Sequence, residues 1–153
     1  MVDELSHEHE TILDLAYLLR RLAAEGLHHA AVDLVDRELA PLLDRHTRKE
    51  ERGLFTQLRA SWSADAQVGE LEDQHRSVEA QLAAIRAGGD GWQDTAAALV
   101  ADLDAHIVEE EVDLFPYAVY LLDDAAWGAV TAVHAQVRGE PDATRARRLA
   151  TSA

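Results

Sequence analysis

Apolar residues recur every three or four positions through most of this chain, which is the spacing of one face of an α-helix. In the first such segment, Leu5, Ile12 and Leu13 lie on a single face. The segments with this pattern cover about residues 3–24, 28–60, 70–87 and 92–115, and a shorter one reaches about residue 137. Strict alternation of apolar and polar residues never lasts beyond a few positions, so the pattern predicts an all-α protein.

Glycines and prolines mark where these helices end or bend. Gly26 ends the first helix, and Pro41 predicts a kink or a split within the second. Residues 61–69 form a predicted loop, residues 88–91 (Gly-Gly-Asp-Gly) end the third helix, and Pro116 marks a kink or stop in the fourth. Four main helices with short connections are typical of an up-down-up-down four-helix bundle.

The C-terminal part differs from the rest. Asp123 and Asp124 can cap a short fifth helix, and the remainder is polar and rich in arginine. We therefore expect residues 1–138 to form the bundle with its short C-terminal helix, and residues 139–153 to form a polar tail. A length of 153 residues is enough to bury a core in one domain.

Charge and composition exclude several classes of function. The chain has 14 Lys+Arg against 29 Asp+Glu, a net charge of −15, which disfavours binding to nucleic acid or to an anionic membrane. The absence of cysteine excludes disulfides, thiolate metal sites and a thiol nucleophile. The acidic N-terminus lacks the apolar core of a signal peptide, and the longest uncharged run, residues 125–137, is too short to span a membrane. We expect a cytoplasmic protein.

One histidine of each main helix lies on the apolar face. His9 shares its face with Leu5, Ile12 and Leu13, whereas His7 falls on the polar face. The other histidines on apolar faces are His46, His75 and His106. Each of these three is followed four residues later by a glutamate on the same face, namely Glu50, Glu79 and Glu110. Because a buried free carboxylate is costly, such pairs point to a metal that neutralises it.

The two halves of the chain also repeat. Residues 46–55 read HTRKEERGLF and residues 106–115 read HIVEEEVDLF, so both follow the pattern His-x-x-x-Glu-Glu-x-x-Leu-Phe. Each copy follows a helix with a single inward histidine, His9 and then His75. A repeated helical hairpin of this kind would pack about a pseudo-twofold axis and build a two-metal centre between the halves.

Over residues 3–120 the chain resembles the bacterial hemerythrin-like family, also called the HHE cation-binding domain. The resemblance implies a non-heme centre of two iron ions, with Glu50 and Glu110 as bridging carboxylates. It also implies four terminal imidazole ligands, His9, His46, His75 and His106. The chain departs from the oxygen-carrying hemerythrins in two ways: Glu79 stands where they have a second histidine, and their last carboxylate is an aspartate five residues after its histidine, whereas Glu110 follows at four. Oxygen carriage is therefore not implied.

Several roles stay open at the level of sequence. Glu79 reads equally as a ligand or as a carboxylate on the helix surface, and Glu72 could accept a hydrogen bond from an imidazole. Three further glutamates, Glu51, Glu109 and Glu111, are expected in solvent.

The leading hypothesis is a protein with two iron ions that binds or senses a small oxidant, namely oxygen, peroxide or nitric oxide. The alternatives are an enzyme that breaks down hydrogen peroxide at the same centre, and a partner-binding helical bundle with one metal or none. The oligomeric state is left open.

Overall fold

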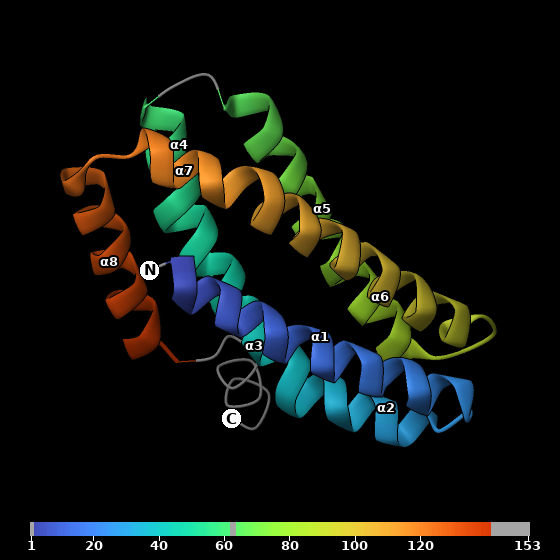
Figure 1. Cartoon of the computed structure of the whole chain (residues 1–153). Helices are drawn as coiled ribbons and strands as arrows, with labels where there is room; N and C mark the ends of the chain where they lie inside the picture. Colours follow the sequence, from blue (N-terminus) through green and yellow to red (C-terminus); the bar gives the residue numbers. More distant parts are fainter. Residues whose placement is uncertain (1, 62–63, 142–153) are drawn as a thin grey trace.

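The computed structural model describes residues 2–61 and 64–141, and every regular element within them is helical (Figure 1). The all-α prediction is thus confirmed. The elements are α1 (Val2–Ala24), α2 (His28–Leu34), η1 (Val35–Leu39), α3 (Ala40–Lys49), η2 (Glu50–Leu54), α4 (Phe55–Ser61), α5 (Asp65–Ala87), α6 (Trp92–Glu109), η3 (Glu110–Leu114), α7 (Phe115–Leu121) and α8 (Asp124–Gly139). The three η elements are short π-helical segments, in which each turn is wider than in an α-helix.

Prolines follow two of these wide segments. Pro41 lies near the start of α3, directly after η1, and Pro116 lies near the start of α7, directly after η3. Proline has no N–H and its ring clashes with the preceding turn of an α-helix, and a wider turn makes room for it. The helical path therefore continues past both prolines, and the fourth stretch ends at Leu121 rather than near residue 115.

The third long helix begins earlier than the sequence suggested. α5 begins at Asp65, so the predicted loop over residues 61–69 is shorter than expected. Val68 and Leu71 are fully buried, and their packing holds the first turns of the helix in spite of Gly69. At the other end, Gly88 and Gly91 take positive φ angles of 69° and 87°, as the predicted break requires.

The buried apolar side chains form two clusters. One contains Ile12, Leu43, Val78 and Leu103, and the other contains Leu5, Leu54, Leu71 and Leu114. Along α1 and α5 the chain passes from the second cluster to the first, and along the stretches that contain α3 and α6 it passes from the first to the second. In each of the four stretches the inward histidine lies between the two clusters.

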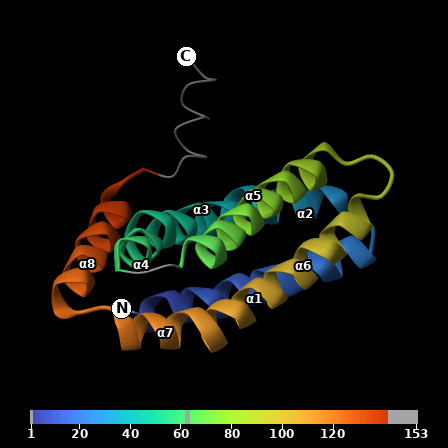
Figure 2. The same cartoon turned by 90° about the horizontal axis from the view of Figure 1, so that it is seen from above.

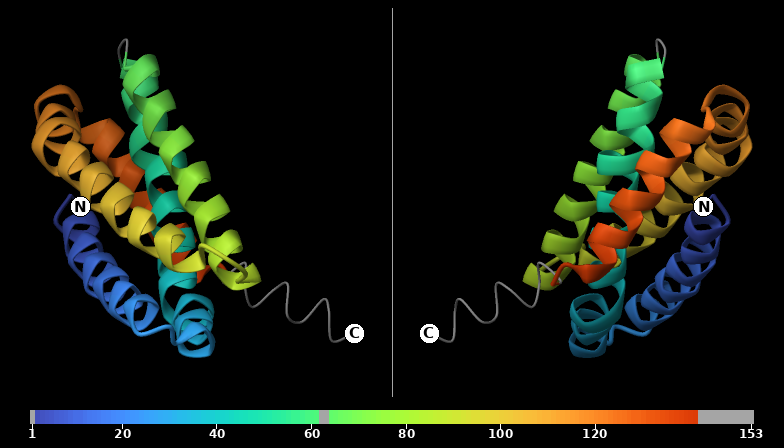
Figure 3. Two further views of the ribbon diagram at one scale, coloured as in Figure 1. Left: turned by 90° about the vertical axis from the view of Figure 1, so that its right-hand side faces the viewer. Right: turned by 90° about the vertical axis from the view of Figure 1, so that its left-hand side faces the viewer.

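The long helices lie side by side, with α6 packed against both α1 and α5 (Figure 3). The helix α8 lies at one end of the molecule, where it packs against η2, α3 and α4 (Figure 2). Its first turn is capped by Asp123, whose carboxylate accepts a hydrogen bond from the N–H of Ala126 at 2.9 Å. Gly53 of η2 lies at this interface, where a Cβ would make an ordinary contact with Val133 of α8 at 3.5 Å.

Among the helices described, none combines the length and the apolar character that a membrane crossing requires. Most of the predicted polar tail, residues 142–153, lies outside the described residues.

Candidate metal centre

Four histidines and two glutamates meet in the interior between the two apolar clusters. The exposed fractions of His9, His46, His75 and His106 are only 2%, 3%, 7% and 6%. They come from α1, α3, α5 and α6, and each helix turns its apolar face, and hence its histidine, inward. Glu50 and Glu110 are fully buried and stand at the first positions of η2 and η3.

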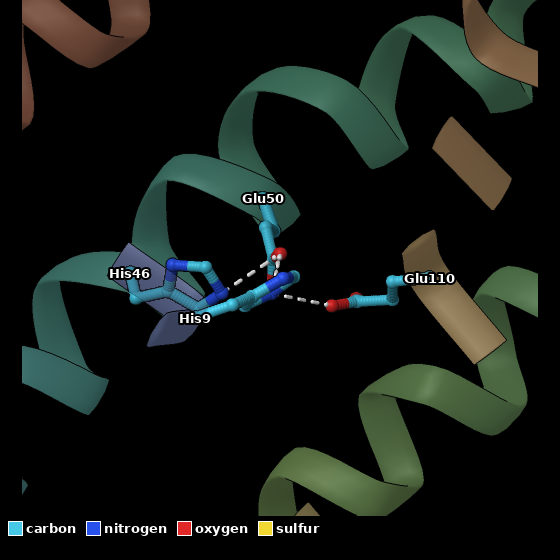
Figure 4. Close-up of side chains that lie close together, drawn as sticks. All are labelled: His9, His46, Glu50 and Glu110. Atoms are coloured by element: carbon cyan, nitrogen blue, oxygen red, sulfur yellow. Dashed lines mark ion pairs between the residues drawn. The ribbon is translucent and has the colours of Figure 1, made fainter. Parts of the chain in front are cut away.

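The side chains of His9, His46, Glu50 and Glu110 form a first cluster that could hold a metal ion (Figure 4). Each offers one ligand atom, and these atoms lie within 4.8 Å of one another. His46 Nε2 lies 3.0 Å from Glu50 Oε1, and His9 Nε2 lies 3.0 Å from Glu110 Oε2. His9 Nε2 is also 3.8 Å from Glu50 Oε1, so both imidazoles face the same carboxylate oxygen.

A second cluster of the same kind contains His75 and His106 together with the same two glutamates. His75 Nε2 lies 3.3 Å from Glu50 Oε2, and His106 Nε2 lies 3.4 Å from Glu110 Oε1. Each carboxylate therefore turns one oxygen toward the first cluster and the other oxygen toward the second. This is the arrangement in which a carboxylate can bridge two adjacent cations.

The polar atoms at the centre lack the partners that buried groups normally have. Both oxygens of Glu50 and of Glu110, together with the Nε2 atoms of His9 and His46, make no hydrogen bond of acceptable geometry within the described part of the chain. Gln81 Oε1 and His134 Nε2 are also unsatisfied elsewhere in the described chain. Leaving the six atoms of the two clusters unsatisfied side by side is especially costly. Cations bound between them would satisfy these atoms and neutralise the carboxylates, so the residues present fit a metal centre.

The electrostatics of the protein without metal show that the buried carboxylates require positive charge beside them. Burial disfavours a charged imidazole, but the adjacent Glu110 and Glu50 outweigh it and raise the pKa of His9 to about 10. In the same way, Glu50 and Glu51 raise the pKa of His75 to about 10 despite burial. In the absence of an ion, protons on these rings supply the positive charge that the buried carboxylates need.

The pKa values of the other four groups in the two clusters depend on which buried charges lie beside them. Burial opposes a charged ring at His46, yet Glu50 and Glu8 raise its pKa to about 9. Burial lowers the pKa of His106 to about 4, and burial together with Glu50 raises the pKa of the Glu110 carboxyl to about 7. Burial alone would raise the pKa of Glu50, but His46 and its other neighbouring histidines hold it well below the usual value.

Each imidazole is oriented by an acceptor on its other nitrogen. His9 Nδ1 donates to Glu111 at 2.7 Å, and His75 Nδ1 donates to Glu51 at 2.9 Å. His46 Nδ1 donates to Glu8 at 2.9 Å, and His106 Nδ1 donates to the side-chain oxygen of Gln74 at 2.6 Å. These hydrogen bonds place the proton on Nδ1, so that the inward Nε2 can bind a cation.

These acceptors correct one prediction from the sequence. Glu51 and Glu111 were expected in solvent, but both are partly buried and hold an imidazole of the opposite half of the chain. They are the second glutamates of the two Glu-Glu pairs in the repeat. Glu109 is also engaged, since it accepts a hydrogen bond from Gln74 at 3.2 Å.

Two other carboxylates whose roles the sequence left open lie outside the centre. Glu79 is exposed and belongs to neither cluster, and Glu72 binds Arg59 at 2.6 Å instead of an imidazole. In α5 the inward positions after His75 are taken by Val78 and Leu82, which leaves Glu79 beside the buried face.

Sequence reasoning missed the π-helical segments that begin at the two glutamates. Two turns of an α-helix take about seven residues, but Leu54 and Leu114 return to the core eight residues after His46 and His106. The wide turns of η2 and η3 accommodate the additional residue. In α5, which has no π-helical segment, Leu82 is buried seven residues after His75. The spacing of eight rather than seven residues was therefore a signal for the wide turns that the sequence already contained.

Comparison with known proteins agrees with this geometry. The model of the hemerythrin HHE cation binding domain family matches residues 1–118, which include all six residues of the two clusters. Neither a curated protein nor a solved structure matches the chain significantly.

Proposed function

Since this chain belongs to the hemerythrin HHE cation-binding domain family, we propose that it holds two iron ions and binds or senses a small oxidant there. One observation carries the proposal: Glu50 and Glu110 each divide their two oxygens between the two clusters. A single cation would leave the other oxygens and the other imidazole pair unsatisfied. The alternation of the two apolar clusters along the four stretches supports an up-down-up-down bundle as the frame of this centre.

Imidazole and carboxylate ligands suit iron, zinc and manganese alike, and affinity alone does not select among them. The choice of iron therefore rests on the family together with the ligand set. Each cluster offers two imidazoles and one oxygen from each of two carboxylates. Such a set leaves coordination positions free on iron, where a small ligand can bind.

When bound, two iron ions supply open coordination positions and electrons for a small oxidant. The chain supplies the environment of that chemistry. The ring of Phe115 stacks on His9 at 5.5 Å and the ring of Phe55 stacks on His75 at 5.8 Å, so apolar side chains keep bulk water from these imidazoles. The hydrogen bonds to Nδ1 keep the four rings turned toward the centre while the charge of the ions changes.

The proposal concerns oxygen, peroxide or nitric oxide as a ligand and does not extend to oxygen carriage. The sequence left Glu79 open as a ligand, and an ionised carboxylate bound to iron there would add negative charge and favour the ferric state, which is one reason against oxygen carriage. Because Glu79 is exposed and outside both clusters, that reason is withdrawn. Two differences from the oxygen carriers remain. The clusters contain no additional imidazole from α5, and Glu110 stands four residues after His106, where the oxygen carriers have an aspartate at five.

Metal analysis combined with absorption spectroscopy tests this proposal. We expect two iron ions per chain and absorption of an oxo-bridged ferric pair in the near ultraviolet. The variants His46→Ala and His106→Ala should each lose at least one ion, whereas the exposed His29→Ala should lose none. Iron content that is unchanged in both cluster variants would contradict the proposal, and steady release of oxygen from hydrogen peroxide would favour the enzyme instead.

A further inference from the structure

The chain has a single lysine, Lys49, against thirteen arginines, and this lysine is buried. Only 3% of its surface is exposed, and it lies three residues after His46 and next to Glu50. A buried ammonium is costly unless carboxylates surround it. Nothing in the proposed binding of two iron ions uses this positive charge.

Lys49 is connected to a proposed iron ligand, His46, through one carboxylate. Its Nζ forms an ion pair with Glu8, and the other oxygen of Glu8 accepts the hydrogen bond from His46 Nδ1 at 2.9 Å. Lys49, Glu8 and His46 thus form a continuous hydrogen-bonded path from a fixed positive charge to the imidazole. The counterpart on His9 is different, because Glu111 has the neutral hydroxyl of Ser6 as its other hydrogen-bond partner, at 3.0 Å.

The position of the ammonium is fixed from its other side by α8. Lys49 Nζ also lies 2.7 Å from Glu4, which is held by His134 at 3.2 Å and by Arg138 at 3.0 Å. His134 is 1% exposed, and α8 lies beyond residue 118, where the family match ends. A helix outside the matched region therefore packs over the ion pairs of Lys49.

The physical effect of this arrangement follows from the acceptor on the imidazole. A carboxylate that accepts the Nδ1 proton makes the ring a stronger donor to a metal, which favours the more highly charged ferric state. An ammonium bound to the same carboxylate draws its negative charge away from the ring. His46 should then be a weaker donor than its carboxylate alone would make it.

We propose that Lys49 is a positioning residue whose buried ammonium, held between Glu4 and Glu8, sets the donor strength of His46 and so raises the reduction potential of the iron centre. The proposal rests on the proposed iron function. It adds the specific claim that a lysine outside both metal clusters raises the reduction potential of the iron centre, and that α8 keeps this lysine in place.

Three variants test the role of Lys49. Lys49→Met removes the charge but keeps an unbranched apolar chain of similar length, and Lys49→Arg keeps the charge. Arg48→Met is the matched control: it removes the same charge from the preceding residue, which pairs with Asp44 and Glu140, each at 2.6 Å, and not with an imidazole acceptor. For each variant, iron content, the reduction potential by spectroelectrochemical titration and the unfolding transition are measured.

We expect Lys49→Met to retain iron and to lower the potential, so that the ferric-to-ferrous ratio at a fixed applied potential rises about tenfold, the order expected of one buried unit charge. Lys49→Arg should restore the potential of the original protein, and Arg48→Met should leave it nearly unchanged. If Lys49→Met unfolds more easily but keeps the original potential, Lys49 only connects α1 and α3 and the proposal is wrong. An equal shift in Arg48→Met would also overturn it.

Two further measurements cover the remaining outcomes. If Lys49→Met does not fold, Glu4→Gln keeps the lysine and frees it to interact with Glu8 alone, so the potential should rise; an unchanged potential would refute the proposal. If the original protein holds no iron, the proposed function fails, but Lys49 can still be tested by titrating metal-free protein with cobalt(II). Lys49→Met should then bind cobalt about tenfold more tightly, and equal affinities would refute the role of Lys49.

Discussion

His7 and His9 lie two residues apart on α1, yet their environments are opposite. The side chain of His7 is 82% exposed, whereas that of His9 is 3% exposed and faces both glutamates of the centre. We expect His9→Ala to lose at least one metal ion per chain and to lower the thermal midpoint, because Glu50 and Glu110 would be buried without their full neutralising shell. The control is His7→Ala, which should change neither quantity. Elemental analysis and thermal unfolding of the two variants test this, and a metal content altered only in His7→Ala would contradict it.

Glu79 offers the reverse case, because it has the spacing of a ligand but is exposed to solvent. Because it is exposed and outside both clusters, we expect Glu79→His to change neither the iron content nor the reduction potential. Surface substitutions of this kind alter stability by no more than about 0.5 kcal/mol. Potentiometry on the two proteins decides the point, and a rise in potential would place Glu79 at the metal after all.

At this scale, the sequence was informative where a residue shares a face with apolar neighbours. His9 and His46 follow that rule, and so do the two buried glutamates. The sequence was uninformative where a contact depends on how two helices meet. Glu51 looks like any solvent-facing glutamate, and only the crossing of α5 brings His75 within 2.9 Å of it.

At the scale of the element, the π-helical segments explain why helical periodicity predicted the stretches but not their details. A search for inward-facing residues every three or four positions also accepts a spacing of eight residues, such as that from His46 to Leu54, because eight is two intervals of four. It therefore identifies a long helix over residues 28–60 without revealing that η2 widens one of its turns. The ends of α5 and α7 were misplaced because tertiary packing, which local sequence does not encode, stabilises turns with weak intrinsic propensity.

Gly53 lies within one of these wide turns, at the contact between η2 and α8. A Cβ at this position would meet Val133 at an ordinary contact distance of 3.5 Å. Gly53→Ala should therefore be accommodated and should raise the free energy of unfolding by up to about 1 kcal/mol, since alanine favours helical backbone. Gly53→Leu should instead push α8 away and lower that free energy by about 1–3 kcal/mol. Chemical denaturation measures both, and equal stabilities of the two variants would argue against close packing here.

At the scale of the whole molecule, proton binding and metal binding compete for the same atoms. The pKa values of His9 and His75 are about 10 and that of His46 is about 9, so these three rings are protonated at pH 7 in the metal-free protein. Compared with an unfolded pKa of 6.5, the raised values stabilise the metal-free fold fully below pH 6.5. This stabilisation is lost as the pH rises through about 9 to 10.

Metal uptake must remove these protons. We expect metal-free protein at pH 7 to release about three to four protons per chain as it binds its ions, three from the rings and a fraction of one from Glu110, whose pKa is about 7. The apparent affinity for metal should fall as the pH is lowered. A pH indicator in weakly buffered solution measures the release during titration with ferrous iron under anaerobic conditions. His7→Ala should release as many protons as the original chain, and uptake without release would show that the cluster is neutral before the metal arrives.

The sharing of carboxylates between the halves also means that neither hairpin is complete alone. Glu50 of the first hairpin faces His75 of the second, and Glu110 of the second faces His9 of the first. The first hairpin by itself would thus lack the imidazole that faces Glu50 from the second, and the second would lack the imidazole that faces Glu110 from the first. A protein of one hairpin would be complete only as a pair of identical subunits. With both hairpins in one chain the two copies need not be identical, and they differ where Gln74 faces His106 but Glu8 faces His46.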